Sequence, residues 1–375
     1  MKSNLKYDYE KLVNLESIIG NKKSCFIVGK NSFTMSGFSV FLKNSKINNY
    51  IIHSDFSVNP KFDDIINGIK IVQDFKPEII IGIGGGSVLD TAKLISVFAT
   101  YNKSIKDVIL GKEKITDRCI ELCLIPTTAG SGSEATHFAV VYMDNNKYSV
   151  ASEYLLPDYV ILDPVLLESL PTKQASISAF DAFSQAIESI WSIHANHESI
   201  EFALESLKLL NNNIDHLILN PNKECRKNIL NASNLAGKAI NITKTTAPHA
   251  LSYFLTINYK IPHGLAVFLF LRQFVHYNSP TNIYKLKSTI LKSDYIYRFN
   301  LILNAINVKN EQELSERILY LLSIANLPNS LIAFGIKTES DLILISDSVN
   351  VERLNNNPMH LEKRDILEIL HKISK

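Results

Sequence analysis

A carboxylate and an amide stand four residues apart in the stretch FDAFSQAIESIWS, residues 180–192. On an α-helix, positions i and i+4 lie one above the other, so Asp181 and Gln185 would project into the same space. A carboxylate in such a place can bind a metal ion, whereas an amide is a much weaker ligand for iron or zinc. Taken alone, the pair is equally compatible with a helix cap and a polar group at the edge of the core.

Two histidines lie in the segment TAPHALSYFLTINYKIPHGLAV, residues 246–267. Imidazole is the commonest protein ligand for iron and zinc, and the sequence Pro-His-Gly predicts that His263 stands at a constrained turn. Either His249 or His263 by itself would be interpreted as an ordinary core or surface histidine. Taken alone, neither histidine is established as a metal ligand by the sequence around it.

A glycine-rich loop occurs in EIIIGIGGGSVLDTAKLIS, residues 78–96. An apolar strand is followed by Gly84, Gly85, Gly86 and Ser87, and a helix is predicted to begin near Val88. Consecutive glycines let the backbone approach a ligand closely, and the start of the helix offers N–H groups to a phosphate. The loop suits a pyrophosphate, although it is not the G-x-G-x-x-G dinucleotide motif, and a tight structural turn is the alternative.

A second loop of small residues, IPTTAGSGSEAT at residues 125–136, follows another predicted strand. The hydroxyl groups of Thr127, Thr128, Ser131 and Ser133 suit contacts with a ribose, a phosphate or a nicotinamide amide. Ligands of parallel α/β sheets bind at the carboxyl ends of the strands, where both loops would emerge. The two loops together indicate a nucleotide site more strongly than either does alone.

The elements that carry these loops predict two domains. Between residues 24 and 165, short apolar runs alternate with helical patterns, which is typical of βαβ units and of a mainly parallel sheet covered on both faces. After residue 170 the pattern changes to long helical stretches. We therefore predict a Rossmann-like α/β domain over residues 1–170 and an all-α domain over 171–375. The predicted strands are SCFIVG, NNYIIHS, EIIIGIG, ELCLIP, FAVVYM and YVILD, with a helix over FDDIINGIKIVQDF.

The composition excludes some classes of partner. The chain has 375 residues, of which 46% are hydrophobic and 20% charged, and its formal net charge is +2 without a basic tract. Neither a nucleic acid nor an anionic membrane is expected to be a partner. The first residues lack the apolar core of a signal peptide, and no window is long and apolar enough to span a bilayer. We expect a cytoplasmic protein whose four cysteines are buried thiols.

Taken together, these segments resemble the iron-containing (group III) alcohol dehydrogenase family over nearly the whole chain. The resemblance implies an architecture shared with dehydroquinate synthase, a bound NAD(P) and a divalent metal, Fe(II) or Zn(II). It also implies a homodimer. The resemblance places the dinucleotide at Gly84, Gly85, Gly86, Ser87, Asp90, Thr127, Thr128 and Ser131. The motifs that carry it are GGGSVLDTAK (84–93), PTTAGSGSE (126–134), LLPDYVILDP (155–164), FDAFSQAIE (180–188) and HALSYFLTINYKIPHG (249–264).

The chain departs from the family at two positions of the site. Family members usually bind iron through one Asp and three His, and here Gln185 replaces the first His. We expect a metal on Asp181, His249 and His263, with Gln185 as a distant ligand or a hydrogen-bond donor to the substrate. A site without metal is the alternative. Tyr253 replaces a further family histidine that is thought to assist proton transfer, so we expect Tyr253, or water near His249, to deliver the proton.

The implied reaction is hydride transfer from a reduced nicotinamide to a small aldehyde, with the metal polarising the carbonyl. After the first predicted strand, in CFIVGKNSF, Lys30 is suited to a 2′-phosphate, which favours NADPH over NADH. The alternative for Lys30 is a lysine that only faces solvent.

The stretches FDAFSQAIESIWS and TKTTAPHALSYFLT are most similar to the subset of the family that reduces phosphonoacetaldehyde to 2-hydroxyethylphosphonate. Lys244, Lys147 and Arg272 would then be candidate partners for the phosphonate. Two other classes of function remain open. One is a metal-assisted lyase of the dehydroquinate synthase type, and the other is a non-catalytic nucleotide-binding protein with a decayed metal site.

Overall fold

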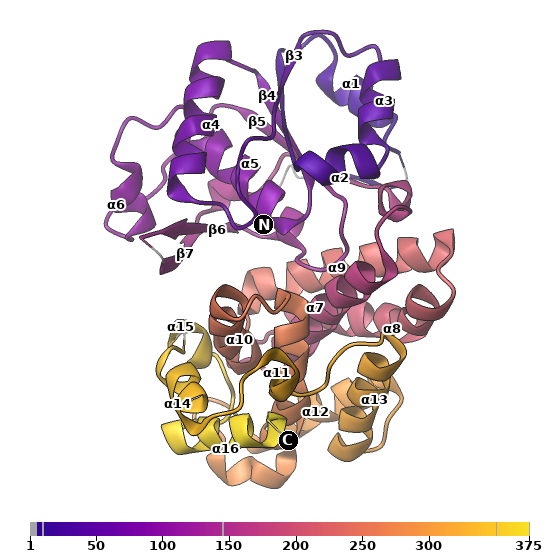
Figure 1. The fold of residues 1–375 in the computed structure, drawn as a ribbon, viewed down its shortest axis with the longest axis vertical. Helices are drawn as coiled ribbons and strands as arrows, with labels where there is room; N and C mark the ends of the chain where they lie inside the picture. Colours follow the sequence, from indigo (N-terminus) through magenta and orange to yellow (C-terminus); the bar gives the residue numbers. More distant parts are fainter. Residues whose placement is uncertain (1–5, 10, 145, 350, 375) are drawn as a thin grey trace. The chain divides into compact units, whose positions relative to one another are not determined.

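The computed structural model describes residues 6–9, 11–144, 146–349 and 351–374. The chain divides into two compact units, Met1–Leu170 and Pro171–Lys375. Figure 1 shows strands and helices in the first unit and helices in the second. The predicted order of an α/β domain followed by a helical domain is therefore confirmed. None of the described helices combines the length and the apolar character that crossing a membrane requires.

The first unit is built on a six-stranded sheet with the order β1-β8-β5-β4-β2-β3, in which every pair of strands is parallel. Gly84, at the end of β4, lies opposite Pro126, at the end of β5. The two small-residue loops therefore leave the sheet at the same edge, as predicted, and the structure adds that their strands are neighbours. The strands are β1 (Lys6–Tyr9), β2 (Ser24–Val28), β3 (Tyr50–His53), β4 (Ile79–Gly84), β5 (Glu121–Pro126) and β8 (Tyr159–Leu162).

Helices cover both faces of this sheet. Cys25 and Ile27 of β2 belong to one buried cluster with residues of α4 and α5. Phe26, which points to the other face, packs against Phe38 of α3 with 6.1 Å between the ring centroids. Burial on both faces explains why the central strands are continuous apolar runs. The helices of this unit are α1 (Asn14–Ile19), α2 (Lys30–Met35), α3 (Phe38–Asn44), α4 (Phe62–Phe75), α5 (Gly86–Phe98) and α6 (Ile105–Ile109).

Three strands differ from the expectation. The run FAVVYM forms β6 (Phe138–Met143), but it pairs antiparallel with β7 (Asn146–Ala151) in a separate hairpin and does not join the parallel sheet. Neither β7 nor β1 was predicted. Both are rich in polar residues, and a short polar strand has no apolar pattern that would distinguish it from a loop.

The second unit surrounds a central helix, α7 (Thr172–Trp191). Nearly every residue from Ser176 to Trp191 is buried, and α7 packs against α8, α9, α11 and α12. Polar side chains on a helix that is buried all round must lie inside the domain. The other helices are α8 (His197–Leu219), α9 (Lys223–Thr243), α10 (Ala247–Asn258), α11 (His263–Tyr277), α12 (Lys292–Ile306), α13 (Glu311–Ile324), α14 (Glu339–Asp347), α15 (Val351–Leu354) and α16 (Lys363–Ile373).

One expectation about the cysteines is wrong. Cys25, Cys123 and Cys225 are buried thiols, but Cys119 is exposed. Cys119 precedes β5 and lies outside the apolar run of that strand, so nothing draws it into the core.

Candidate metal and dinucleotide sites

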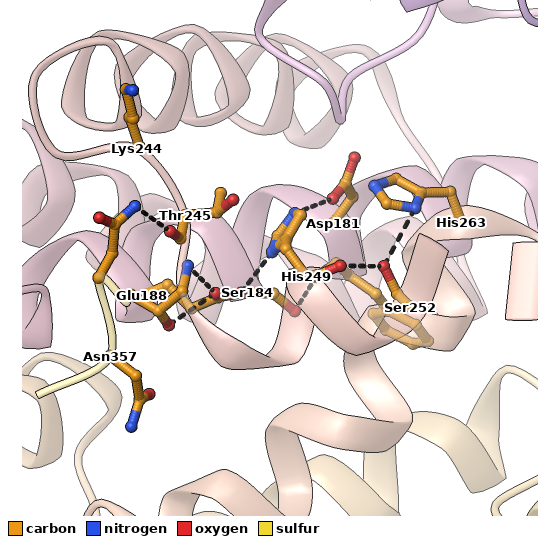
Figure 2. Close-up of polar contacts among 12 residues, drawn as sticks. Asp181, Ser184, Glu188, Lys244, Thr245, His249, Ser252, His263 and Asn357 are labelled. Atoms are coloured by element: carbon orange, nitrogen blue, oxygen red, sulfur yellow. Dashed lines mark hydrogen bonds and ion pairs between the residues drawn. The ribbon is translucent and has the colours of Figure 1, made fainter. Parts of the chain in front are cut away.

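Three predicted ligands from three helices meet inside the second unit. Asp181 lies on α7, His249 on α10, and His263 is the first residue of α11. Their ligand atoms all lie within 4.8 Å of one another, and Figure 2 shows the three side chains directed toward a common point. One carboxylate and two imidazoles form a donor set that suits iron or zinc and leaves coordination positions open. The residues present therefore fit a divalent metal.

A glycine allows α11 to approach α7 closely at this point. A Cβ atom at Gly264 would lie 3.1 Å from Cβ of Asp181 and inside contact distance of the backbone carbonyl oxygen of Ile177. Gly264 follows His263 directly, so its lack of a side chain brings the first turn of α11 onto the turn of α7 that carries Asp181.

Glu188 holds His249 from the side opposite to Asp181, and it was not predicted. One carboxylate oxygen accepts a hydrogen bond from Nδ1 of His249 at 2.5 Å. The other oxygen accepts from the backbone N–H and the hydroxyl of Thr246, at 2.7 and 2.8 Å. This arrangement leaves Nε2 of His249 facing Asp181, 3.2 Å away. Glu188 lies two helical turns after Asp181 on the same face of α7, and this spacing is the signal that could have revealed it.

The charges of these groups are strongly coupled. Burial alone would lower the pKa of His249, but the charge of Glu188 and the hydrogen bonds to Asp181 and Glu188 outweigh burial and raise the pKa to about 9. Burial would raise the pKa of Asp181, yet the hydrogen bond from His249 and the charges of both histidines lower it overall. The raised pKa favours a proton on His249, between Asp181 and Glu188, in the metal-free protein. A metal ion must displace its proton in order to bind.

Two more polar groups orient the ligands. The side chain of Gln185 forms a hydrogen bond with Asp181, and because a carboxylate only accepts, the amide nitrogen is the donor. Ser252 donates its hydroxyl to the carbonyl of His249 at 2.8 Å and faces Nδ1 of His263 at 3.4 Å. A proton on Nδ1 of His263 would leave its Nε2 available to a metal. The role of Gln185 as a distant ligand or as a donor to the substrate stays a prediction.

Tyr253 lies beside this cluster. Its ring stacks on the ring of His263, with centroids 5.8 Å apart and an interplanar angle of 16°, and its hydroxyl is hydrogen-bonded to the side chain of Thr245. Burial raises the pKa of Tyr253, and the opposing charge of Arg353 does not fully offset that effect. A raised pKa makes the phenol a weaker acid. Proton delivery by Tyr253 thus stays a prediction that requires solvent to return the proton.

We expect the variant Glu188→Gln to bind a divalent metal about 10- to 100-fold more weakly than the wild type, as is usual when a partner of a ligating histidine is lost. Three donors converge on Glu188, and a carboxamide has only one acceptor oxygen. Titration of the metal-free protein with Zn(II) measures the effect. Glu201→Gln, on the exposed surface of α8, is the matched control, and equal affinities of the two variants would contradict the prediction.

The predicted dinucleotide loops contact each other in the first unit. The N–H of Thr127 donates to the carbonyl of Gly84 at 3.0 Å, and Gly86 lies directly beside Ser131. The helix α5 begins at Gly86, two residues earlier than predicted, so Gly86 and Ser87 contribute N–H groups of its first turn. Among the described residues, the buried Oγ1 of Thr127 has no hydrogen-bond partner. An orphaned hydroxyl at this edge suits a bound ligand.

Asp90 joins α5 to the second loop. Its carboxylate accepts hydrogen bonds from the hydroxyl of Ser133 at 2.6 Å and from the N–H of Val140 at 3.0 Å. The ammonium group of Lys93, one turn later, is fully buried and donates to the carbonyls of Thr136 and Phe138. These bonds give Asp90 a structural role between the loops. Direct contact of Asp90 with a cofactor stays a prediction.

The predicted cations lie in different settings. Lys30 forms an exposed ion pair with Asp55 at 2.9 Å, so a 2′-phosphate would compete with a carboxylate. Lys244 forms an ion pair with Glu352 at 2.6 Å. Arg272 lies on α11, the helix that begins at His263, and its contact with a substrate phosphonate stays a prediction. Lys147 belongs to β7 in the first unit.

We expect Gly86→Ala to weaken dinucleotide binding by about 10- to 100-fold, which corresponds to the usual cost of overpacking. The added Cβ would lie 2.8 Å from Oγ of Ser131, so the two loops would have to separate. Quenching of protein fluorescence by NADH and NADPH measures the affinity. Zn(II) affinity should be unchanged because the metal ligands lie in the other unit; unchanged dinucleotide binding would contradict the prediction.

Each half of the chain matches a model of the same protein family. Residues 5–164 match the family model of iron-containing alcohol dehydrogenase, and residues 175–374 match that of the Fe-containing alcohol dehydrogenase family, C-terminal. The sulfoacetaldehyde reductase of Bilophila wadsworthia is 31% identical over 326 residues, which cover 85% of this chain and 82% of the relative. Long-chain-alcohol dehydrogenase 1 of Geobacillus thermodenitrificans is 32% identical over 216 residues, 57% of this chain and only 55% of that relative.

The fold is also that of a solved structure. The crystal structure of sulfoacetaldehyde reductase from Bifidobacterium kashiwanohense in complex with NAD+ superimposes with a TM-score of 0.87 and 24% sequence identity. The superposition covers 99% of this chain and 97% of the other. At this identity, the likeness establishes the fold.

Proposed function

Because the chain belongs to the iron-containing alcohol dehydrogenase family and is an enzyme of that family, we propose that it reduces a small aldehyde to the corresponding alcohol with a reduced nicotinamide dinucleotide. The observation that carries this proposal is the cluster of Asp181, His249 and His263, whose ligand atoms lie within 4.8 Å of one another. Because the chain belongs to a family of iron-containing alcohol dehydrogenases, this cluster is suited to hold the metal of the reaction.

In this proposal, Asp181, His249 and His263 hold Fe(II) or Zn(II). A bound metal would supply Lewis-acid stabilisation of the negative charge that develops on the carbonyl oxygen. Gln185 orients the carboxylate of Asp181, and Glu188 fixes the ring of His249. Tyr253 or solvent near His249 supplies the proton that the alcohol oxygen requires.

The loops after β4 and β5 would bind the dinucleotide, whose nicotinamide supplies the hydride. Lys30 supports NADPH, whereas Asp55 beside it and the NAD+ of the related sulfoacetaldehyde reductase structure support NADH. The choice between the two is part of the test. We further propose a cytoplasmic homodimer, an assembly that sedimentation of the purified protein checks.

The identity of the substrate is the most detailed part of the proposal. Similarity of the two site motifs supports phosphonoacetaldehyde, whose product would be 2-hydroxyethylphosphonate. A relative that spans most of this chain is named for sulfoacetaldehyde, which has the same two-carbon aldehyde and a different acid. Both compounds are therefore substrates to compare with simple aldehydes.

The test is oxidation of NADH and of NADPH by metal-stripped protein with Fe(II), Zn(II) or no metal added back. Consumption of one dinucleotide per aldehyde reduced supports the proposal. Dinucleotide that binds without net consumption would favour the lyase of the dehydroquinate synthase type if another substrate is converted. Binding without any conversion would favour the non-catalytic alternative.

A further inference from the structure

A buried guanidinium lies on the short helix α15. Arg353 is only 7% exposed, and charged side chains are rarely buried to this extent because desolvation of the charge is costly. The preceding residue, Glu352, is bound to Lys244 in a pair whose side chains are 58% and 39% exposed. Of the two cations near the connection between α9 and α10, Lys244 therefore faces solvent and Arg353 faces the interior.

The segment after Arg353 is anchored by buried amides. The side-chain amide of Asn356 donates to the carbonyl of Thr245 at 2.9 Å, and its backbone carbonyl accepts from the N–H of Ile193 at 3.1 Å. Asn357 is fully buried and exchanges two hydrogen bonds of 3.0 Å with Asn278. Figure 2 shows Asn357 directed away from the metal cluster. Buried, satisfied amides of this kind fix the position of a backbone.

Contacts between elements connect the segment of Arg353 with the proposed active site. The helix that carries it packs against α10, which bears His249 and Tyr253. Burial raises the pKa of Tyr253, and the positive charge of Arg353 is the strongest influence acting in the opposite direction. Tyr253 in turn stacks on His263. The segment that follows Arg353 also bonds to Thr245, and the next residue along the chain, Thr246, donates to Glu188, which holds His249.

A cation near the cluster would help the site to bind an anionic substrate. The cluster and its surroundings contain two acidic side chains, Asp181 and Glu188, and a divalent ion would add two positive charges beside them. A substrate that brings a further negative charge into the same interior needs a second cation, because unpaired buried charges are strongly unfavourable. The planar guanidinium of arginine matches two oxygens of a carboxylate, sulfonate or phosphonate.

We propose that Arg353 binds an anionic group at the far end of the aldehyde, and that it makes the site selective for small aldehydes that carry an acid. This inference rests on the proposed function, since it concerns the substrate of the same site. Arg353 is a specificity-determining residue in this scheme, and Lys244 is a surface residue.

The test compares the wild type with Arg353→Met and Arg353→Lys. The anionic substrates are sulfoacetaldehyde, phosphonoacetaldehyde and succinic semialdehyde, and the neutral ones are propanal and butanal. We expect the ratio of kcat/KM for anionic over neutral aldehydes to fall on the order of 100-fold in Arg353→Met, mainly through KM, because one partner of a buried charge pair is lost. Arg353→Lys keeps the positive charge but loses the paired N–H donors of the guanidinium. Its ratio of kcat/KM should therefore lie between those of the wild type and Arg353→Met. The matched control is Arg317→Met, an arginine of α13 paired with Asp215.

A second readout does not depend on turnover. Calorimetry measures the affinity of the alcohol 2-hydroxyethanesulfonate for the wild type and for both variants. We expect a loss of affinity in Arg353→Met and a smaller loss in Arg353→Lys, and equal affinities would overturn the inference.

The outcomes separate this inference from the proposed function. A wild type that reduces aldehydes without preferring anionic ones, or variants that lose both classes of substrate equally, would overturn the role of Arg353 while the proposed function stands. Absence of turnover with every aldehyde would overturn the proposed function, and the calorimetry would still decide on Arg353. If Arg353→Met does not fold, Arg353→Lys and the selectivity of the wild type decide. The anion with the highest kcat/KM identifies the acid group.

Discussion

The variant Asp181→Ala is expected to lose at least about 1,000-fold in kcat/KM for aldehyde reduction, because Lewis-acid stabilisation of the developing charge contributes several kcal/mol. Asp181 is the only carboxylate in the described three-residue cluster. Without it, two imidazoles remain, and His249 has lost the partner of its Nε2 atom. We therefore also expect the bound metal content, measured after equilibration with Fe(II) or Zn(II), to fall close to zero.

Asp294→Ala is the matched control for this experiment. Asp294 lies near the start of α12 in a partly exposed ion pair with Arg298, which makes at most a small contribution to stability. Circular dichroism of both variants checks that the helical unit is folded. Full activity of metal-free wild type, or of Asp181→Ala, would contradict the metal mechanism and leave Gln185 and Tyr253 as the groups that activate the carbonyl.

The variant Gly264→Ala is expected to lower kcat/KM by about 100-fold, the loss typical of a misplacement of roughly 1 Å in an active site. The new Cβ would collide with the carbonyl oxygen of Ile177, a backbone atom that cannot rotate away. The first turn of α11 would have to move off α7 and carry His263 away from Asp181. We also expect the free energy of unfolding to fall by about 1–3 kcal/mol, as for other overpacked cores. Denaturant unfolding and metal titration measure the two effects.

Gly68→Ala separates this effect from the general effect of an alanine in place of a helical glycine. Gly68 lies within α4 in the first unit, and a Cβ there would meet the end of the Ile95 side chain, which can change rotamer. We expect Gly68→Ala to retain the metal affinity of the wild type. If Gly264→Ala retains it as well, the close approach of α7 and α11 does not position the ligands.

The sequence alone predicted the elements whose pattern is local. The helix over residues 62–75 and the strand over 121–126 have the predicted bounds, because apolar periodicity and a continuous apolar run are properties of neighbouring residues. That the two loops share one edge of the sheet also followed from the sequence, through the rule for parallel strands. The strands β1 and β7 did not, because their polar sequences gain their structure from pairing with distant residues or within a hairpin.

The same division holds for the site. Helical spacing placed Asp181 and Gln185 on one face of α7, and the family resemblance added His249 and His263. Only the tertiary structure showed that Gln185 bonds to Asp181 itself, and that Glu188 holds His249 across 61 residues of sequence.

The burial of Arg353 could not be predicted from the sequence for the same reason. Its segment is anchored to Thr245 across 111 residues, and no local pattern reports such a contact. Residue types and spacing determined which side chains are capable of binding a metal. The packing of α7, α10 and α11 decided which polar side chains contact them, because those contacts form only when distant helices bury their faces against one another.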